Sequence, residues 1–178
     1  FQKSKIILII LSMLRLLLVF SLLLTLLSCS STSKTSVNAG NIKSDITLYK
    51  EGMRYLKAKD FENAIEIFTE LEIVHPYSNF SSKSQLMSGF AQYMSNEYEE
   101  AILTLTKFIE LNPDHESIPY AMYLKAYSYY ERKPAVNFDQ RTSEKAIEEF
   151  KELINKFPKS KYSKKARLHL NTLNNHLA

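Results

Sequence analysis

The chain has 178 residues, enough for one domain with a sizeable hydrophobic core. Three of its 23 basic residues fall within the first 15 positions, and the remaining 20 nearly balance the 19 acidic residues, which argues against a nucleic-acid partner. The single cysteine excludes an internal disulfide, and only three glycines leave no room for a phosphate-binding loop.

The N-terminal segment is almost unbroken apolar sequence from Ile6 to Ser28, preceded by two lysines. A basic start, an apolar run and small residues are typical of a secretory signal. Cys29 follows Leu-Leu-Ser directly, in an order that resembles the lipobox of bacterial lipoproteins, where cleavage before the cysteine accompanies acylation of its thiol. We therefore predict a signal peptide over residues 1–28 and lipid attachment at Cys29. An uncleaved membrane-spanning helix is the alternative, because the run is long enough to cross a bilayer.

Residues 29–43 are rich in Ser, Thr and Asn and show no apolar period, so we predict a lipidated flexible tether there. From residue 44 to residue 178, Leu, Ile, Ala and Tyr recur at spacings of three and four. This periodicity predicts an all-α domain.

Three segments of this domain share one pattern. Segment 52–76 aligns with segment 89–113 at a constant spacing of 37 residues, and segment 144–158 repeats the second half. The pattern resembles the tetratricopeptide repeat, a stacked pair of antiparallel helices. We predict an α-solenoid of three helix-turn-helix units, at about 45–78, 82–115 and 119–160, followed by a seventh helix as a partial fourth repeat over 161–178.

The matched positions have distinct packing roles. A small residue in the first helix and an alanine in the second allow close approach, an aromatic residue fills the space between units, and a proline ends the second helix. In this chain the repeat-packing residues are Gly52, Gly89 and Ala126; Ala64, Ala101 and Ala146; Phe68 and Phe150; and Pro76, Pro113 and Pro158. The second unit departs from the pattern, with Gln92 and Leu105 where aromatic residues are usual.

The stretch from Tyr120 to Tyr130 contains five tyrosines. Four of them form one helical stripe, whereas Tyr129 takes the position of Tyr55 in the first unit and is predicted to be core. In such repeats one face of the first helix lines the concave surface, so the stripe predicts an aromatic groove for an extended peptide. The alternative is that the rings cover a hydrophobic seam. The groove candidates are Tyr49, Met53, Phe90, Tyr93, Tyr120, Tyr123, Tyr127 and Tyr130, and the same register includes Ile46, Leu56, Lys83 and Leu86.

No catalytic or metal-binding arrangement is predicted. His75, His115, His169 and His176 lack metal-ligand spacing, and the one cysteine is assigned to lipid, so we expect a non-enzymatic protein whose only attached group is the lipid on Cys29. Six basic residues and no acidic residue follow position 153. They form either a solvated capping face or a contact for an acidic partner or anionic headgroups.

The combination of lipobox, tether and tandem repeats resembles the BamD (ComL) family of outer-membrane assembly lipoproteins. The resemblance is carried by "HPYSNFSSKSQL" (75–86), "LNPDHESIPYAMYLKAYSYY" (111–130), and "FPKSKYSKKARLHLNTLNNHLA" (157–178). It implies a lipid-anchored protein on the periplasmic face of the outer membrane. It also implies binding to the POTRA region of BamA, to other lipoproteins of the assembly machinery and to unfolded β-barrel precursors through their C-terminal aromatic signal.

Members of that family have about five repeats, and the later repeats contribute much of the contact with BamA. Because this chain ends within the fourth repeat, we expect either that it is a fragment or a shortened product or that its contact with BamA is altered. The alternative function is that of another periplasmic tetratricopeptide-repeat lipoprotein, for example a scaffold in envelope constriction or peptidoglycan synthesis.

Overall fold

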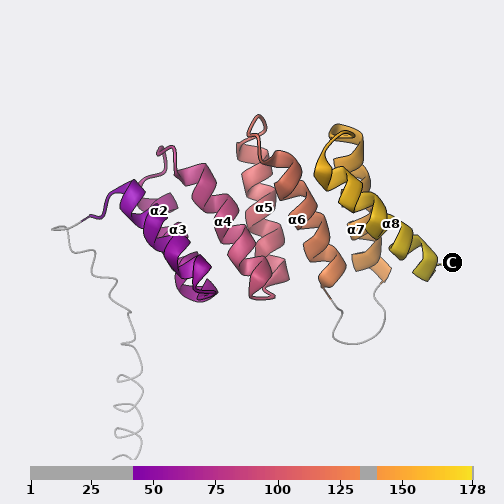
Figure 1. The fold of residues 1–178 in the computed structure, drawn as a ribbon, viewed down its shortest axis with the longest axis horizontal. Helices are drawn as coiled ribbons and strands as arrows, with labels where there is room; N and C mark the ends of the chain where they lie inside the picture. The colour runs from indigo at the N-terminus through magenta and orange to yellow at the C-terminus, as the bar shows by residue number, and fades with distance from the viewer. Residues whose placement is uncertain (1–41, 133–139, 178) are drawn as a thin grey trace, which may run out of the picture. The chain divides into compact units, whose positions relative to one another are not determined.

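The computed structural model of the chain describes residues 42–132 and 140–177. The predicted signal peptide, Cys29 and nearly all of the predicted tether lie outside these residues. The described residues from Lys43 onward form one compact unit. They contain seven helices and no strand, which confirms the predicted all-α class. In chain order the helices are α2 (Asp45–Lys57), α3 (Phe61–Val74), α4 (Ser81–Met94), α5 (Tyr98–Leu111), α6 (Ile118–Glu131), α7 (Gln140–Lys156) and α8 (Lys161–Leu177) (Figure 1).

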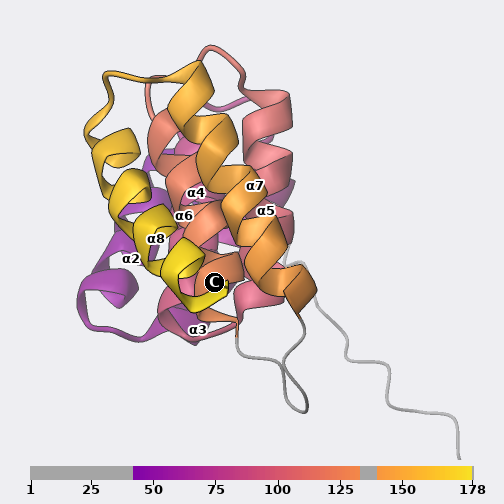
Figure 2. The ribbon, with the colours of Figure 1, turned by 90° about the vertical axis from the view of Figure 1, so that its right-hand side faces the viewer.

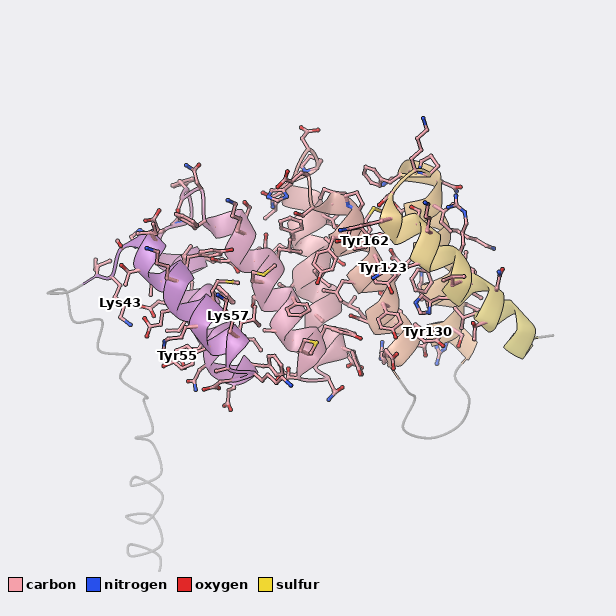
Figure 3. The ribbon with its side chains drawn as sticks, viewed as in Figure 1. Lys43, Tyr55, Lys57, Tyr123, Tyr130 and Tyr162 are labelled. Carbon is pink, nitrogen blue, oxygen red and sulfur yellow. The ribbon has the colours of Figure 1, made fainter. Side chains whose placement is uncertain are left out.

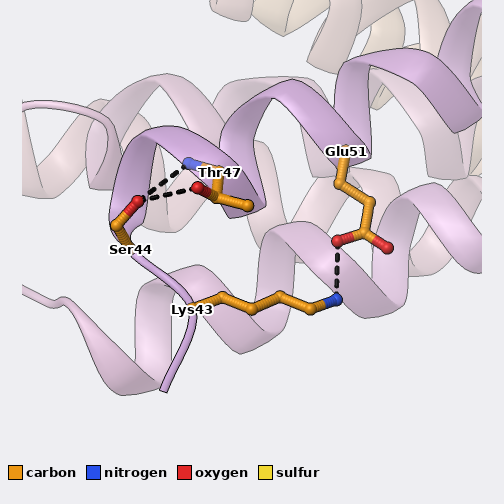
Figure 4. Close-up of polar contacts among 4 residues, drawn as sticks. All are labelled: Lys43, Ser44, Thr47 and Glu51. Carbon is orange, nitrogen blue, oxygen red and sulfur yellow. Dashed lines mark hydrogen bonds and ion pairs between the residues drawn. The ribbon is translucent and has the colours of Figure 1, made fainter. Parts of the chain in front are cut away.

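Helix α2 begins with a capped first turn. The side-chain oxygen of Ser44 accepts a hydrogen bond from the backbone N–H of Thr47 and lies 2.8 Å from the Thr47 hydroxyl (Figure 4). Capping of this kind satisfies a donor that has no partner within the helix. Lys43, just before the helix, forms a 2.6 Å ion pair with Glu51 two turns further on. These contacts place the start of the helical unit at residues 43–44.

In the first and second units, the two helices are joined by a tight turn that contains one residue with positive φ. Lys59 has a φ of 61° in the first unit, and Asn96 has a φ of 66° at the matching place in the second. Asp60, which follows Lys59, caps α3 by accepting a hydrogen bond from the backbone N–H of Asn63. Left-handed backbone suits Asn better than Lys, so the first turn is the more strained of the two.

Successive units are joined by a second kind of turn that is the same in all three places. The backbone N–H groups of Ser78, His115 and Ser160 donate to the carbonyls of His75, Asn112 and Phe157, each at 3.0 Å. The three predicted helix-ending prolines lie inside these turns, two residues beyond the last residue of α3, α5 and α7. They are Pro76, Pro113 and Pro158, and all three are exposed.

The core contains three rows of residues that repeat from unit to unit. Each row is fully buried, with 0% exposure throughout. Because a row continues from one unit to the next, each unit completes the core of its neighbour. The rows are Ala64, Ala101 and Ala146; Phe68, Leu105 and Phe150; and Leu71, Phe108 and Leu153.

The helices form two layers that differ in how closely they pack. The backbones of neighbouring first helices come close together, α2 to α4, α4 to α6, and α6 to α8, whereas the backbones of α3, α5 and α7 stay farther apart from one another. Figure 2, which looks along the stack, shows α6 and α8 on one side and α5 and α7 on the other. A stack whose first helices lie closer together curves toward that layer. The concave face of the helical unit is therefore formed by α2, α4, α6 and α8. Within the described residues, no helix is both long enough and apolar enough to span a membrane.

Candidate functional site

The concave layer carries a run of stacked tyrosine rings on α6. Tyr123 and Tyr127 are stacked with ring centroids 5.7 Å apart, and Tyr127 and Tyr130 are stacked at 5.5 Å. Residues spaced by three or four positions lie one above another on a helix, which is why these rings meet. Tyr120 continues the run toward the N-terminal end of α6.

Rings from the two neighbouring first helices extend this run. Tyr93 of α4 lies 5.8 Å from Tyr127, and Tyr162 of α8 lies 5.2 Å from Tyr120. His169 of α8 completes the cluster, 4.8 Å from Tyr127. Figure 3 labels Tyr162, Tyr123 and Tyr130, which follow one another along the boundary between α6 and α8. We call the set Tyr93, Tyr120, Tyr123, Tyr127, Tyr130, Tyr162 and His169 the tyrosine ladder.

The phenol groups of Tyr93, Tyr120, Tyr123 and Tyr127 are neutral at physiological pH, because their pKa values are raised. Burial raises the pKa of Tyr93 and of Tyr120 to about 12, and burial together with a hydrogen bond to Glu131 raises the pKa of Tyr127 further. Neutral phenols both donate and accept hydrogen bonds, so the ladder offers apolar ring faces with polar edges. An extended peptide with aromatic or aliphatic side chains suits such a surface.

Two lysines of α8 flank the ladder. The ammonium of Lys165 lies 5.8 Å from the centre of the Tyr123 ring, and that of Lys161 lies 5.1 Å from the centre of the Tyr162 ring. These contacts have the geometry of cation–π interactions. They place part of the predicted basic C-terminal face at the border of the ladder. The exposed residues of that face are Lys156, Lys159, Lys161, Lys164, Lys165 and Arg167, of which Lys156 pairs with Glu152 at 2.7 Å.

The candidates of the first unit form a second, separate aromatic group. Tyr49 packs 4.9 Å from Phe80 and 6.1 Å from Phe68. Met53 is half-buried beside this group. Between the two groups, Leu86 is only 4% exposed and belongs to the core. The predicted continuous stripe is thus interrupted in the second unit, where Phe90 and Tyr93 alone continue it.

All eight groove candidates are half-buried: Tyr49, Met53, Phe90, Tyr93, Tyr120, Tyr123, Tyr127 and Tyr130. Each packs against core residues on one side. Tyr129, expected to be core, is half-buried as well and packs against the same cluster. The exposed fraction therefore does not distinguish Tyr129 from the tyrosines of the ladder. The ring contacts distinguish it, because Tyr129 belongs to none of the stacked pairs of tyrosines.

The small residues at the repeat-packing positions lie where the helices approach most closely. A Cβ atom added to Gly52 would lie 2.5 Å from the buried ring of Phe68, and one added to Gly89 would lie 2.9 Å from Leu105. Ala126, which holds the third of these positions, is fully buried.

Sequence reasoning missed the contribution of α8 to the ladder. His169 was grouped with the scattered histidines, yet its ring also stacks 5.5 Å from that of Phe150. The sequence did contain one signal for Tyr162, because Tyr162 aligns with Phe80 of the first inter-repeat turn. Phe80 packs on Tyr49 of α2, and Tyr162 packs in the same way on Tyr123 of α6. Within the described residues, no group of three or more acidic, histidine or cysteine side chains is placed to hold a metal ion.

The helix pairs, the inter-repeat turns and the concave aromatic layer define a tetratricopeptide-repeat protein, and solved structures of that class share the fold. A structure of MamA 41-end from Desulfovibrio magneticus RS-1 matches 75% of this chain and 66% of its own, with a TM-score of 0.58 and 20% identity. The TPR domain of Arabidopsis OM64 matches 75% of this chain and 98% of its own, with a TM-score of 0.57 and 15% identity.

More specifically, the chain belongs to the YfiO family of outer membrane lipoproteins, whose sequence model matches residues 42–178. Curated relatives are named outer membrane protein assembly factor BamD. The Caulobacter vibrioides relative is 40% identical over 131 residues, which is 74% of this chain and 43% of the relative. The Rickettsia prowazekii relative is 36% identical over 146 residues, or 82% of this chain and 58% of the relative. The chain thus spans about half the length of these relatives.

Proposed function

We propose that this protein is a non-enzymatic, lipid-anchored component of outer-membrane β-barrel assembly that binds unfolded barrel precursors through the tyrosine ladder. It acts beside the POTRA region of BamA and the other lipoproteins of that machinery, on the periplasmic face of the outer membrane. Membership of the outer membrane lipoprotein family and the names of its relatives support the assembly role.

The observation that supports peptide binding is the row of stacked tyrosine rings on the concave layer. Barrel precursors are exposed as extended chains with alternating apolar residues, and extended chains place alternate side chains on one face. A row of half-buried rings gives such side chains flat apolar contacts at a low entropy cost, because a tyrosine has few rotamers to fix. The phenol hydroxyls are left to pair with the peptide backbone.

Binding to a synthetic peptide tests this function. The probe is the last ten or so residues of a barrel precursor, ending in an aromatic residue and carrying a fluorophore, titrated with the full chain in detergent. Tyr127→Leu removes the central ring of the ladder and should weaken binding about tenfold. Tyr129→Leu is the matched control, because Tyr129 lies on the same helix and is half-buried too, but is not part of the ladder.

Three results bear on the proposal. Weaker binding in Tyr127→Leu with unchanged binding in Tyr129→Leu supports it. Equal binding in all three proteins contradicts peptide recognition by the ladder. Co-purification with BamA from detergent-solubilised envelopes tests the assembly role separately, and its failure would favour a scaffold of another envelope process.

A further inference from the structure

A hollow of about 940 Å³ opens between α3 and α5, beside the first turn of α4. It lies beside the turn that joins the first helix pair to the second. It shares no residue with the tyrosine ladder. Its size falls in the range of ligand-binding sites in proteins. The hollow is therefore a second candidate site, independent of the proposed function.

The side chain of Gln85 lines this hollow and is only 4% exposed. Within the described residues its carboxamide makes no hydrogen bond, but its amide atoms are not sealed off from the hollow. An amide offers two N–H donors and a carbonyl acceptor. These groups are therefore available to a partner that enters the hollow.

Comparison with the other units makes Gln85 unusual. The positions 37 residues before and after it are occupied by Leu48 and Met122, which are 0% and 2% exposed and belong to the core. Ser84, next to Gln85, is also fully buried, and its hydroxyl has no hydrogen-bond partner. The second unit thus replaces an apolar core position with an amide at the place where the hollow opens.

The rim of the hollow is apolar and unusually exposed. Tyr77 in the inter-repeat turn is fully exposed at 101%, Ile73 of α3 is 73% exposed, and Leu111 of α5 is 65% exposed. An apolar rim spread over three elements is typical of a contact with another protein, because a small ligand would be enclosed instead.

The wall of the hollow carries a net positive formal charge. It contains the ammonium groups of Lys83 and Lys107 and the carboxylate of Glu72. Glu72 already faces Lys107 at 3.7 Å across the gap between α3 and α5. Within the part of the chain that the structure describes, the ammonium of Lys83 lies 5.7 Å from the ring of Phe80 and forms no ion pair, so it can pair with a carboxylate from outside.

We propose that this hollow is a docking site for an extended segment of a partner protein that carries a large apolar side chain and a neighbouring acidic residue. The carboxamide of Gln85 pairs with a peptide group of the segment, since a carboxamide offers the same donor and acceptor that a backbone amide seeks. The apolar side chain packs against Tyr77, Ile73 and Leu111, and the acidic side chain pairs with Lys83.

Selection from a library of random peptides tests this site. The probe is a phage-displayed library of peptides of roughly 12 residues, selected on the full chain in detergent and followed by anisotropy measurements with individual synthetic peptides. Enriched peptides should share an acidic residue close to a large apolar residue. Gln85→Leu, which restores the residue type of the first unit, and Tyr77→Ala should each weaken their binding about tenfold. Tyr127→Leu is the control and should leave that binding unchanged.

The outcomes that overturn the proposal are specific. Failure to enrich any peptide argues against a docking site, and so does binding that is lost in Tyr127→Leu but kept in Gln85→Leu. Thermal unfolding of Gln85→Leu provides a second readout. Because leucine occupies the matching core position of the first unit, at Leu48, the melting temperature should stay equal or rise. A fall of several degrees would mean that Gln85 supports the fold instead.

Discussion

The hydroxyl of Tyr123 lies 3.1 Å from Nε2 of His169, a residue 46 positions further along the chain. This contact joins α6 to α8 within the tyrosine ladder. The imidazole is packed among rings, 4.8 Å from Tyr127 and stacked on Phe150. Burial lowers the pKa of His169; Glu131 opposes this shift and Lys165 adds to it. His169 is therefore held as a neutral imidazole, and α8 docks on α6 through that neutral form.

The stability of the folded chain should fall as the solution is acidified through the range in which histidines titrate. The pKa of His169 is lower in the folded state than in the unfolded state, so the unfolded chain binds the proton more readily. The stability that the neutral imidazole contributes is present above the unfolded pKa of about 6.5 and is lost as pH falls toward the folded pKa. Urea unfolding at several pH values between about 7.5 and 5.5 measures this loss.

The variant His169→Gln isolates the contribution of this one group. Glutamine does not titrate, so the free energy of unfolding of the variant should depend less steeply on pH than that of the wild type. Equal slopes for the two proteins would show that some other group causes the loss.

The repeat pattern predicted the helical architecture because each position that recurs between the repeats makes a packing contact within its own helix pair. The spacing of 37 residues between Gly52 and Gly89 places both glycines against the side chain of the second helix, Phe68 in one unit and Leu105 in the other. Pro76 and Pro113 prevent α3 and α5 from continuing, because proline has no backbone N–H and its ring clashes with the preceding turn.

The ladder was predictable only in part. The four tyrosines of α6 follow from helical periodicity, but the contact between Tyr123 and His169 depends on how one unit stacks on the next. The burial of Leu86 and of Gln85 likewise depends on that stacking. A sequence pattern gives the face of a helix but not the fraction of that face covered by a neighbouring unit.

Replacing Lys59 by glycine should stabilise the protein. Lys59 has a φ of 61° in the turn between α2 and α3, a conformation that is unfavourable for a residue with a Cβ atom. Glycine relieves this strain but adds freedom to the unfolded chain, so we expect a net gain of about 0.5–1 kcal/mol. Asn96→Gly should gain less, because asparagine tolerates this conformation and its side chain accepts a hydrogen bond from Tyr98. Chemical denaturation of both variants tests the order; a larger gain at Asn96 would contradict it.

Alanine at Gly52 should be more harmful than alanine at Gly89. The added Cβ atom would lie 2.5 Å from the ring of Phe68, which is fully buried and has no room to move. We expect a loss of about 1–3 kcal/mol, only partly offset by the better helix propensity of alanine. At Gly89 the added Cβ atom would lie 2.9 Å from Cγ and Cδ2 of Leu105, which is fully buried too, so we expect a loss that is smaller than at Gly52 but not absent. Thermal unfolding compares the two, and equal losses would contradict the packing argument.

Attachment to the membrane should depend on Cys29, which lies outside the described residues. If the thiol is acylated, two or more acyl chains anchor the protein stably, since each buried methylene contributes about 0.8 kcal/mol. The variant Cys29→Ser, expressed in a Gram-negative host, should lose the added acyl mass seen by mass spectrometry of the purified protein. The alternative, an uncleaved membrane-spanning helix, predicts a different result. Neither the wild type nor the variant would then carry acyl mass, and both would keep the apolar N-terminal segment and sediment with the envelope. N-terminal sequencing separates the two cases, because a lipoprotein begins at residue 29 with a blocked amino group.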